Sequence, residues 1–272
     1  MENTTPPVKA YKNMDFLTSP SARSIRMLSE FYEPQYRFRK NNILDTIVFF
    51  GSARIMSREE AESNLKKIKS EYEKDPAGNE QQLKNAEKML EISHYYESAA
   101  ELAGRLTKWS MSLETEHKRF IVCSGGGPGI MEAANKGAAE AGGFSVGLNI
   151  SLPFEQFVNK YVKPDHAFEF HYFFMRKFWF VYLAKALIVF PGGFGTLDEL
   201  MEVLTLQQTG KIKKNMKIIV FGKDYWQKVI NFDALVEFGT ISREDLDLFD
   251  FCDTVDEAYE KITDHFIKNY LQ

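Results

Sequence analysis

The stretch ALIVFPGGFGTLDEL, residues 186–200, changes character abruptly in its middle. Five apolar residues suited to a buried strand run directly into Pro191 and a set of three glycines, and an acidic, helix-like segment follows. A glycine turn between a strand and a helix lets backbone N–H groups approach a ligand, and the start of the helix attracts anions. The stretch therefore predicts a strand, an anion-binding turn and a helix, in that order.

Other short apolar runs along the chain have the same strand-like character, and they cover residues 46–50, 119–124, 144–150 and 217–221. Helix-length segments with an apolar spacing of about 3.6 residues lie between them, at 130–142 and 197–210. Near-continuous apolar strands that alternate with helices indicate a parallel sheet with both faces covered. We therefore predict an α/β fold, a Rossmann-like doubly wound parallel sheet with helices on both faces, whose ligands bind at the carboxyl ends of the strands.

The length and composition favour one domain rather than two. A chain of 272 residues, 44% of them hydrophobic, can bury one large core. We expect a single Rossmann-like domain over 1–272, with residues 1–40 as an N-terminal arm and residues 58–117 as a helical insertion or elaborated crossover. Within that insertion, two charged helices should flank the turn sequence DPAGN at 75–79.

The charge, the cysteine content and the amino-terminal sequence argue against several classes of protein. A net charge of −4 argues against a partner with a phosphate backbone, so we expect no nucleic-acid partner. Cys123 and Cys252 lie in apolar surroundings without metal-ligand spacing, which favours a reducing compartment. The amino terminus lacks a signal-peptide pattern, and the apolar run around 178–190 is broken by Lys185. We therefore expect a cytoplasmic protein with no membrane partner.

A second glycine-rich turn, CSGGGPGIMEAANKGA at 123–138, repeats the strand–turn–helix arrangement. Its spacing is not that of a dinucleotide fingerprint, because the sixth position from Gly125 is Ile130 and the next strand ends without an acidic residue. Neither glycine turn is followed by the Lys–Ser/Thr pair of a nucleotide triphosphatase loop. A purely structural tight turn remains the alternative. The candidate phosphate-binding residues are Gly51, Ser52, Gly126, Gly127, Lys177, Gly192, Gly193, Gly195 and Thr196.

Two charged residues add chemistry to these turns. Asp198 and Glu199 are expected in the first turn of a helix, where the helix dipole alone could explain them. Glu199, however, follows Thr196 by one turn on the same side, where it could contact the sugar of a ligand whose phosphate lies on the loop. Arg176 stands with Lys177 in the aromatic run 168–182, either as a surface cation or as a ligand for a carboxylate or phosphate.

Three motifs together closely resemble the LONELY GUY family of nucleoside 5′-monophosphate phosphoribohydrolases, long labelled lysine decarboxylases. They are SGGGPGIMEAANKGA, the Arg-Lys pair of FFMRKF, and PGGFGTLDEL, which matches the family pattern PGGxGTxxE in full. The resemblance covers roughly residues 45–225 and is to the longer bacterial branch. It implies that Arg176 and Glu199 are catalytic and that the glycine–threonine turn holds the phosphate. The plant enzymes carry Met-His-Glu before the Arg-Lys pair, whereas this chain has Phe173, Phe174 and Met175.

These residues predict a hydrolase that cleaves the N-glycosidic bond of a purine nucleoside 5′-monophosphate, either AMP or a cytokinin riboside monophosphate, to free base and ribose 5-phosphate. Cleavage builds positive charge on the ribose, which a carboxylate such as Glu199 can stabilise while it activates water. We expect no metal and no cofactor, since the five histidines are scattered and no lysine is suited to pyridoxal phosphate chemistry.

The same residues leave an alternative open, a non-catalytic nucleotide or cofactor carrier, or a regulatory protein, of the same fold. The resemblance also implies a homodimer or higher homo-oligomer. The aromatic run 168–182 is a candidate contact surface, although packing in the core would explain its composition equally well.

Overall fold

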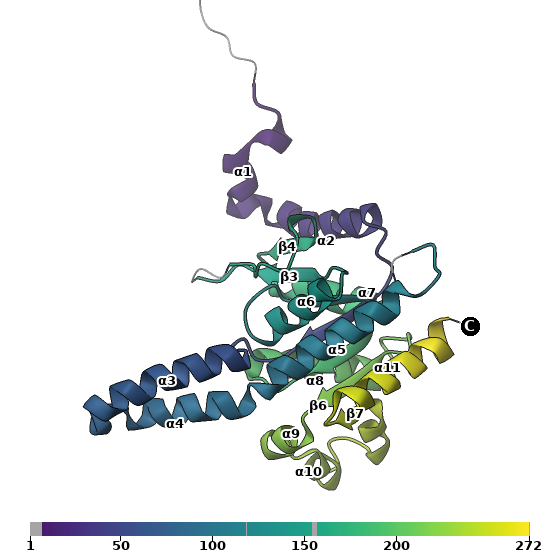
Figure 1. Ribbon diagram of the computed structural model, residues 1–272. Helices are drawn as coiled ribbons and strands as arrows, with labels where there is room; N and C mark the ends of the chain where they lie inside the picture. Colours follow the sequence, from purple (N-terminus) through teal and green to yellow (C-terminus); the bar gives the residue numbers. More distant parts are fainter. Residues whose placement is uncertain (1–6, 118, 154–156, 272) are drawn as a thin grey trace, which may run out of the picture.

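A parallel sheet of seven strands forms the centre of the computed structural model, which describes residues 7–117, 119–153 and 157–271 (Figure 1). The strands are β1 (Thr46–Phe50), β2 (Ile121–Ser124), β3 (Val146–Ile150), β4 (Ala167–Phe170), β5 (Ala184–Val189), β6 (Lys217–Phe221) and β7 (Asp250–Cys252). They lie in the order β4-β3-β2-β1-β5-β6-β7, and each neighbouring pair is parallel. The predicted α/β fold with a doubly wound parallel sheet is confirmed.

The order of the strands reverses between β1 and β5. From β1 the chain builds outward through β2, β3 and β4, and it then returns to the other side of β1 to build β5, β6 and β7. In open α/β sheets, the crevice at such a reversal, outside the carboxyl ends of the strands, is where ligands bind. Here the residues that follow β1 begin with Gly51, and those that follow β5 include Pro191 and Gly192.

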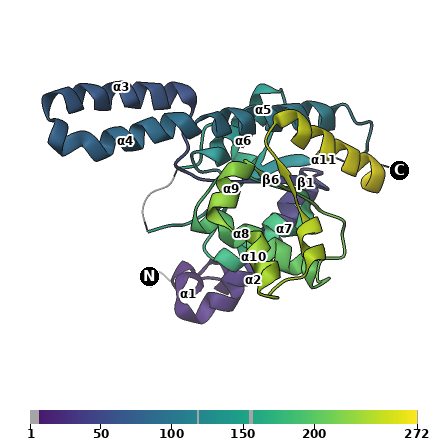
Figure 2. The same ribbon diagram turned by 90° about the horizontal axis from the view of Figure 1, so that it is seen from below.

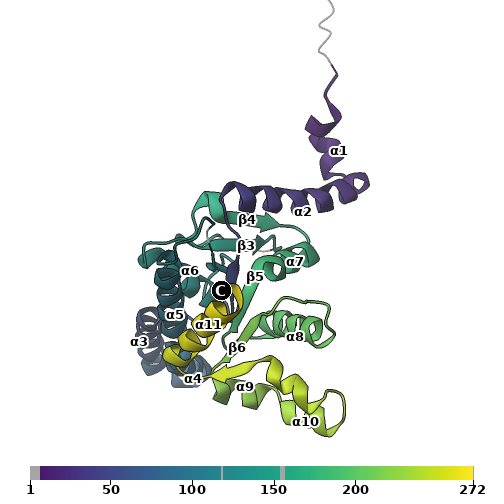
Figure 3. The ribbon, with the colours of Figure 1, turned by 90° about the vertical axis from the view of Figure 1, so that its right-hand side faces the viewer.

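The helices cover both faces of this sheet (Figure 3), with α5, α6 and α11 on one side and α7 and α8 on the other. No helix among the described residues has both the length and the apolar character to cross a bilayer. The α-helices are α1 (Met14–Thr18), α2 (Arg23–Lys40), α3 (Arg58–Lys74), α4 (Pro76–Ile92), α5 (His94–Met111), α6 (Ile130–Glu140), α7 (Phe173–Leu183), α8 (Phe194–Gln208), α9 (Lys223–Val229), α10 (Phe232–Glu237) and α11 (Val255–Tyr270).

The alternation of side chains along the strands divides the core into two layers. In β1, Ile47 and Phe49 are buried against α5, α6 and α11, whereas Val48 and Phe50 are buried on the opposite face. Every residue of β1 is buried, because the strand has a neighbour on each side and helices on both faces. This is why the strand is continuously apolar rather than alternating in its sequence, apart from its first residue.

The insertion at 58–117 holds three helices, not the two that the sequence predicted. The second expected helix is divided at Ser93 into α4 and α5. Only α5 is a packed crossover helix between β1 and β2, and it buries several apolar side chains fully, whereas α3 and α4 each bury a single alanine. The α3–α4 hairpin therefore projects from the body of the molecule, as Figures 1 and 2 show.

The N-terminal arm consists of the short helix α1 and the longer α2. Helix α2 lies across the β4 end of the sheet (Figure 3), where Phe38 stacks on Phe168 with ring centroids 4.9 Å apart. On the same side of α2, Phe31 packs against Phe178 and Trp179 of α7. The arm therefore contacts a helix of the core, while nothing is described for residues 1–6.

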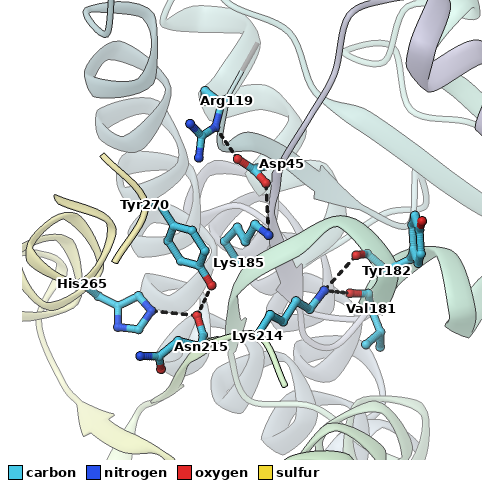
Figure 4. A network of polar contacts seen from close by, with 9 residues as sticks. All are labelled: Asp45, Arg119, Val181, Tyr182, Lys185, Lys214, Asn215, His265 and Tyr270. Atoms are coloured by element: carbon cyan, nitrogen blue, oxygen red, sulfur yellow. Dashed lines mark hydrogen bonds and ion pairs between the residues drawn. The ribbon is translucent and has the colours of Figure 1, made fainter. Parts of the chain in front are cut away.

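A charged network lies at the opposite edge of the sheet from the turns, near the amino ends of β1 and β5 (Figure 4). The buried carboxylate of Asp45 pairs with Arg119 and with Lys185, the latter at 3.4 Å. Lys214 donates hydrogen bonds to the carbonyl oxygens of Val181 and, at 2.9 Å, Tyr182. Lys214 thus satisfies carbonyl groups in the last turn of α7, where a helix favours positive charge.

Candidate active site

A cavity of about 320 Å³ lies at the point where the strand order reverses. Its walls come from the ends of β1 and β3, from the segments that follow β1, β2, β3 and β5, and from the amino-terminal parts of α6, α7 and α8. The predicted site residues that line it are Gly51, Ser52, Gly127, Arg176, Gly193, Gly195, Thr196 and Glu199. Segments separated by up to about half of the chain therefore converge on one pocket.

The amino end of α8 opens into this cavity. The helix begins at Phe194, directly after the Pro191–Gly193 turn, and its N-cap residue Gly193 provides no side-chain cap. The first N–H groups of a helix have no acceptor within the helix. A Cβ built on Gly193 or on Gly195 would meet nothing within 4 Å, so the backbone on this side is open to a ligand. The start of α8 therefore has the strand–turn–helix geometry that suits an anion, and the anion site itself stays a prediction.

Two of the predicted phosphate-binding glycines, Gly126 and Gly192, do not line the cavity. Gly126 has a φ of +23°, and a Cβ there would collide with the side-chain amide of Asn149. A Cβ on Gly192 would collide with the hydroxyl of Thr196, and the Gly192 carbonyl accepts a hydrogen bond from Tyr225 at 2.9 Å. The need for glycine at both positions follows from close packing in the turns.

The segment after β1 ties the two glycine turns together. The Ser52 N–H donates to the carbonyl of Pro191 at 2.9 Å, and the Ser52 carbonyl accepts from the N–H of Ile130 at 3.1 Å. Gly51 must be glycine because a Cβ would lie 2.7 Å from the side chain of Ile130. The first N–H of α6 is therefore already paired with Ser52.

Glu199 is 4% exposed, and its Oε2 atom has no hydrogen-bond partner among the residues that the structure describes. The predicted position in the first turn was wrong, because α8 begins at Phe194 and has no acidic residue in its first turn. The helix-dipole explanation therefore loses its basis, since the dipole acts within the first turn. Burying an unpaired carboxyl group is unfavourable for folding, and such groups are typical of functional sites.

Burial also changes how Glu199 titrates. It raises the pKa of this carboxyl to about 7, although the positive charges of Lys177 and Arg176 favour the ionised form. Near neutral pH, Glu199 can therefore both accept and release a proton, which suits a general base.

Arg176 enters the cavity from the first turn of α7. Its Nε atom donates to the carbonyl of Leu148 at 2.8 Å, and the guanidinium carbon lies 4.8 Å from the centre of the Phe180 ring. A Cβ on Gly125 would come within 2.7 Å of Arg176 Nη2, so glycine at that position makes room for the guanidinium. No hydrogen bond joins Arg176 to Glu199 in the described part of the chain, so the pairing that the sequence suggested is limited to attraction at longer range.

Lys177 has a different position from its neighbour. Its Nζ atom pairs with Asp198 at 2.8 Å and with Glu202 at 2.7 Å, and it does not line the cavity. Successive helical residues point about 100° apart, so Arg176 and Lys177 cannot both face the ligand. Lys177 instead links α7 to α8, the two helices that carry Arg176 and Glu199.

Several lining residues were not predicted as site residues from the sequence, among them Arg54, Met131, Asn149 and Leu152. Arg54 lies three residues after Gly51, and Asn149 lies near the end of β3. Polar residues at or just after the end of a buried strand are the signal that would have indicated both. Asn159 supports the site from outside by donating to the carbonyls of Gly126 at 3.0 Å and Gly127 at 3.1 Å. Residues 154–156, between β3 and β4, lie outside the described residues.

Sequence comparison relates this chain to known proteins. Residues 131–262 match the model of the family described as "Possible lysine decarboxylase". The chain is 28% identical over 156 residues to the probable cytokinin riboside 5′-monophosphate phosphoribohydrolase LOG4 of rice, Oryza sativa subsp. japonica. That match spans 55% of this chain and 64% of the rice protein. Together the two matches support membership of the LONELY GUY family, as the motifs indicated.

Comparison with solved structures finds two molybdenum cofactor proteins among the similar chains. The molybdenum cofactor carrier protein of Chlamydomonas reinhardtii is 18% identical, with a TM-score of 0.45 over 65% of this chain and 90% of its own. The molybdenum cofactor binding protein of Rippkaea orientalis is 19% identical, with a TM-score of 0.45 over 62% and 86% of the two chains. Likeness at this distance assigns no ligand.

Proposed function

We propose that this protein hydrolyses the N-glycosidic bond of purine nucleoside 5′-monophosphates and releases the free base and ribose 5-phosphate. AMP is the first substrate to test, and a cytokinin riboside monophosphate is a special case of the same reaction. The observation that carries the proposal is the buried, unpartnered carboxyl of Glu199, which shares one cavity with Arg176 and with the open amino end of α8.

The arrangement suggests how the reaction would proceed. The 5′-phosphate binds at the start of α8, which leaves the ribose beside Glu199 about one turn further along. As the bond between C1′ and the base nitrogen breaks, its electron pair goes to the base and positive charge develops on the ribose, which the ionised carboxylate stabilises. Water then adds at C1′ and gives its proton to Glu199, while Arg176 holds the nucleotide in position. Transfer of that proton through water to the departing base nitrogen yields the neutral free base and restores the carboxylate of Glu199.

The activity should fall on the acid side of neutrality. Since burial raises the pKa of Glu199 to about 7, the carboxylate that the reaction needs is lost progressively as the pH drops through that value. We expect kcat/KM for AMP to fall about tenfold for each pH unit below this point, with the dependence of a single proton. A pH–rate profile that stays flat down to the usual pKa of a glutamate would contradict the assignment of Glu199 as the base.

Exchange of the arginine for lysine tests whether the guanidinium has a specific role. Arg176→Lys keeps the charge but loses the planar fork, which is already anchored to Leu148 through Nε. A lost charge-assisted hydrogen bond is worth roughly 1.5–3 kcal/mol, so we expect AMP cleavage to slow by at least about tenfold. Lys177→Arg is the matched control, because Lys177 does not line the cavity and instead pairs with Asp198 and Glu202. An unchanged rate in Arg176→Lys would remove Arg176 from the mechanism.

One assay separates the proposed enzyme from its alternatives. Purified protein is incubated with a panel of nucleoside monophosphates, and the released base is measured by chromatography. Binding of a nucleotide without release of base would favour a carrier of the same fold, which would have no use for the buried Glu199. Decarboxylation of lysine with pyridoxal phosphate is disfavoured, because none of the described residues that line the cavity is a lysine.

We also propose that the protein forms a homodimer or a higher homo-oligomer through the exposed aromatic side chains of α7. These side chains are Phe173, Phe174, Phe178 and Tyr182. Large exposed apolar side chains grouped on one helix are typical of contact surfaces. Light scattering coupled to size-exclusion chromatography measures the mass directly, and a monomer at all concentrations would contradict the proposal.

A further inference from the structure

Helix α7 carries Arg176, yet its own sequence does not cap its amino end. The N-cap residue is Tyr172, which makes no side-chain capping hydrogen bond. A carboxylate from the N-terminal arm takes this role instead. Glu30 of α2 accepts hydrogen bonds from the backbone N–H groups of His171 at 2.9 Å and Tyr172 at 3.2 Å, one on each carboxylate oxygen. A negative charge at this position also complements the positive end of the helix dipole.

The same residue of α2 contacts α7 a second time. The indole N–H of Trp179 donates to the backbone carbonyl of Glu30 at 2.9 Å, and the ring of Phe31 lies 6.0 Å from that of Trp179. Arg176 lies between these two contacts, and its own N–H donates to the carbonyl of Tyr172 at 3.2 Å. The backbone turn that Glu30 holds is therefore the turn from which Arg176 projects.

We propose that Glu30 is a positioning residue for Arg176, so that the N-terminal arm contributes to turnover without contacting the substrate. This inference rests on the proposed function, in which Arg176 contacts the nucleotide. Arg176 Nε is fixed on the carbonyl of Leu148 and its guanidinium beside Gly125, so a shift of the first turn of α7 would misplace the guanidinium in the cavity. The arm lies outside residues 131–262, the part that the family model matches.

The test compares steady-state kinetics of Glu30→Gln with those of two controls. The glutamine has one acceptor oxygen in place of two and no charge, so we expect kcat for AMP to fall about three- to tenfold. Glu33→Gln removes another carboxylate from α2. Among the described contacts, the Glu33 carboxylate pairs only with Arg37 at the surface, so kcat should stay within about twofold of the wild-type value. Thr254→Ala removes a comparable cap from α11, on the other face of the sheet, and should lower thermal stability without lowering kcat.

A double-mutant cycle separates positioning from a general loss of structure. If Glu30 acts through Arg176, Glu30→Gln should cost less than about twofold in kcat when Arg176 is already lysine. Amide hydrogen exchange over residues 171–176 should also be faster in Glu30→Gln than in Glu33→Gln.

The outcomes of these measurements test the positioning role of Glu30 separately from the proposed function. Fully additive effects of Glu30→Gln and Arg176→Lys on kcat would overturn the positioning role. The same conclusion follows if kcat and the rates of amide hydrogen exchange in Glu30→Gln equal those in Glu33→Gln. In either case, an active wild-type protein leaves the proposed function standing. If the wild-type protein releases no base from any nucleoside monophosphate, the proposed function fails, and the role built on it fails too.

Discussion

Glu199→Gln is expected to abolish most of the activity and, at the same time, to make the protein more stable. Loss of a general base lowers turnover by about 10²–10⁴-fold, while binding of AMP should persist because the amino end of α8 is unchanged. Burial raises the pKa of Glu199 from its usual 4.5 to about 7. The folded state therefore favours the neutral carboxyl, and stability is lost as the pH rises from the lower value through the higher one.

Above the raised pKa, the wild-type protein carries a buried negative charge that the amide of glutamine lacks. A difference of this size in pKa corresponds to about 3 kcal/mol, as an upper estimate of the gain in free energy of unfolding. Thermal denaturation well above neutrality and again near pH 5 measures the effect, which should be largest at the higher pH. Asp198→Asn is the matched control, since the neighbouring Asp198 is mostly exposed and pairs with Lys177. A Glu199→Gln protein with normal turnover, or one destabilised at high pH, would contradict the catalytic assignment.

The 5′-phosphate is expected to be essential for efficient cleavage. Adenosine cannot use the open N–H groups at the start of α8, and each charge-assisted hydrogen bond is worth roughly 1.5–3 kcal/mol. If two such bonds are lost, kcat/KM for adenosine should be lower than for AMP by at least about a hundredfold. Parallel assays of base release from the two compounds give this ratio directly. Comparable rates would assign the glycine turns to packing alone.

Gly195→Ala provides a control within the chain for this prediction. Because a Cβ at Gly195 would meet nothing within 4 Å, the added methyl group should leave the fold intact and occupy only the space of the ligand. The exchange should therefore lower kcat/KM for AMP while it leaves the slow cleavage of adenosine nearly unchanged. An equal loss for both compounds would indicate that the alanine disturbs the whole cavity rather than the phosphate site.

Much of the sheet could be predicted from the sequence, because strands buried on both faces are continuously apolar. The two edge strands, β4 and β7, were missed for physical reasons. In β4 the exposed Glu169 interrupts the apolar run, and β7 has three residues of which only Cys252 is fully buried. A strand with one neighbour needs fewer apolar residues, so its sequence resembles that of a loop.

The pairing of Arg176 with Glu199 in one cavity could also be predicted, since α7 and α8 directly precede and follow the central strand β5. The directions in which individual side chains point could not be predicted from the sequence. Lys177 faces Asp198 and Glu202 rather than the cavity, and this depends on where α7 begins. The contact of Glu30 with His171 spans 141 residues, and no local pattern indicates it.

The reversal of strand order has a consequence for the smallest piece of this chain that could fold. Residues 131–262 contain Arg176, Glu199 and five strands, but they lack β1 and β2, which lie between β3 and β5 in the sheet. A fragment with those bounds would hold two separate groups of strands with exposed edges and no central pair to join them, a state prone to aggregation. The cavity draws on both groups, so a bound nucleotide should slow global unfolding of the intact chain rather than protect one region alone.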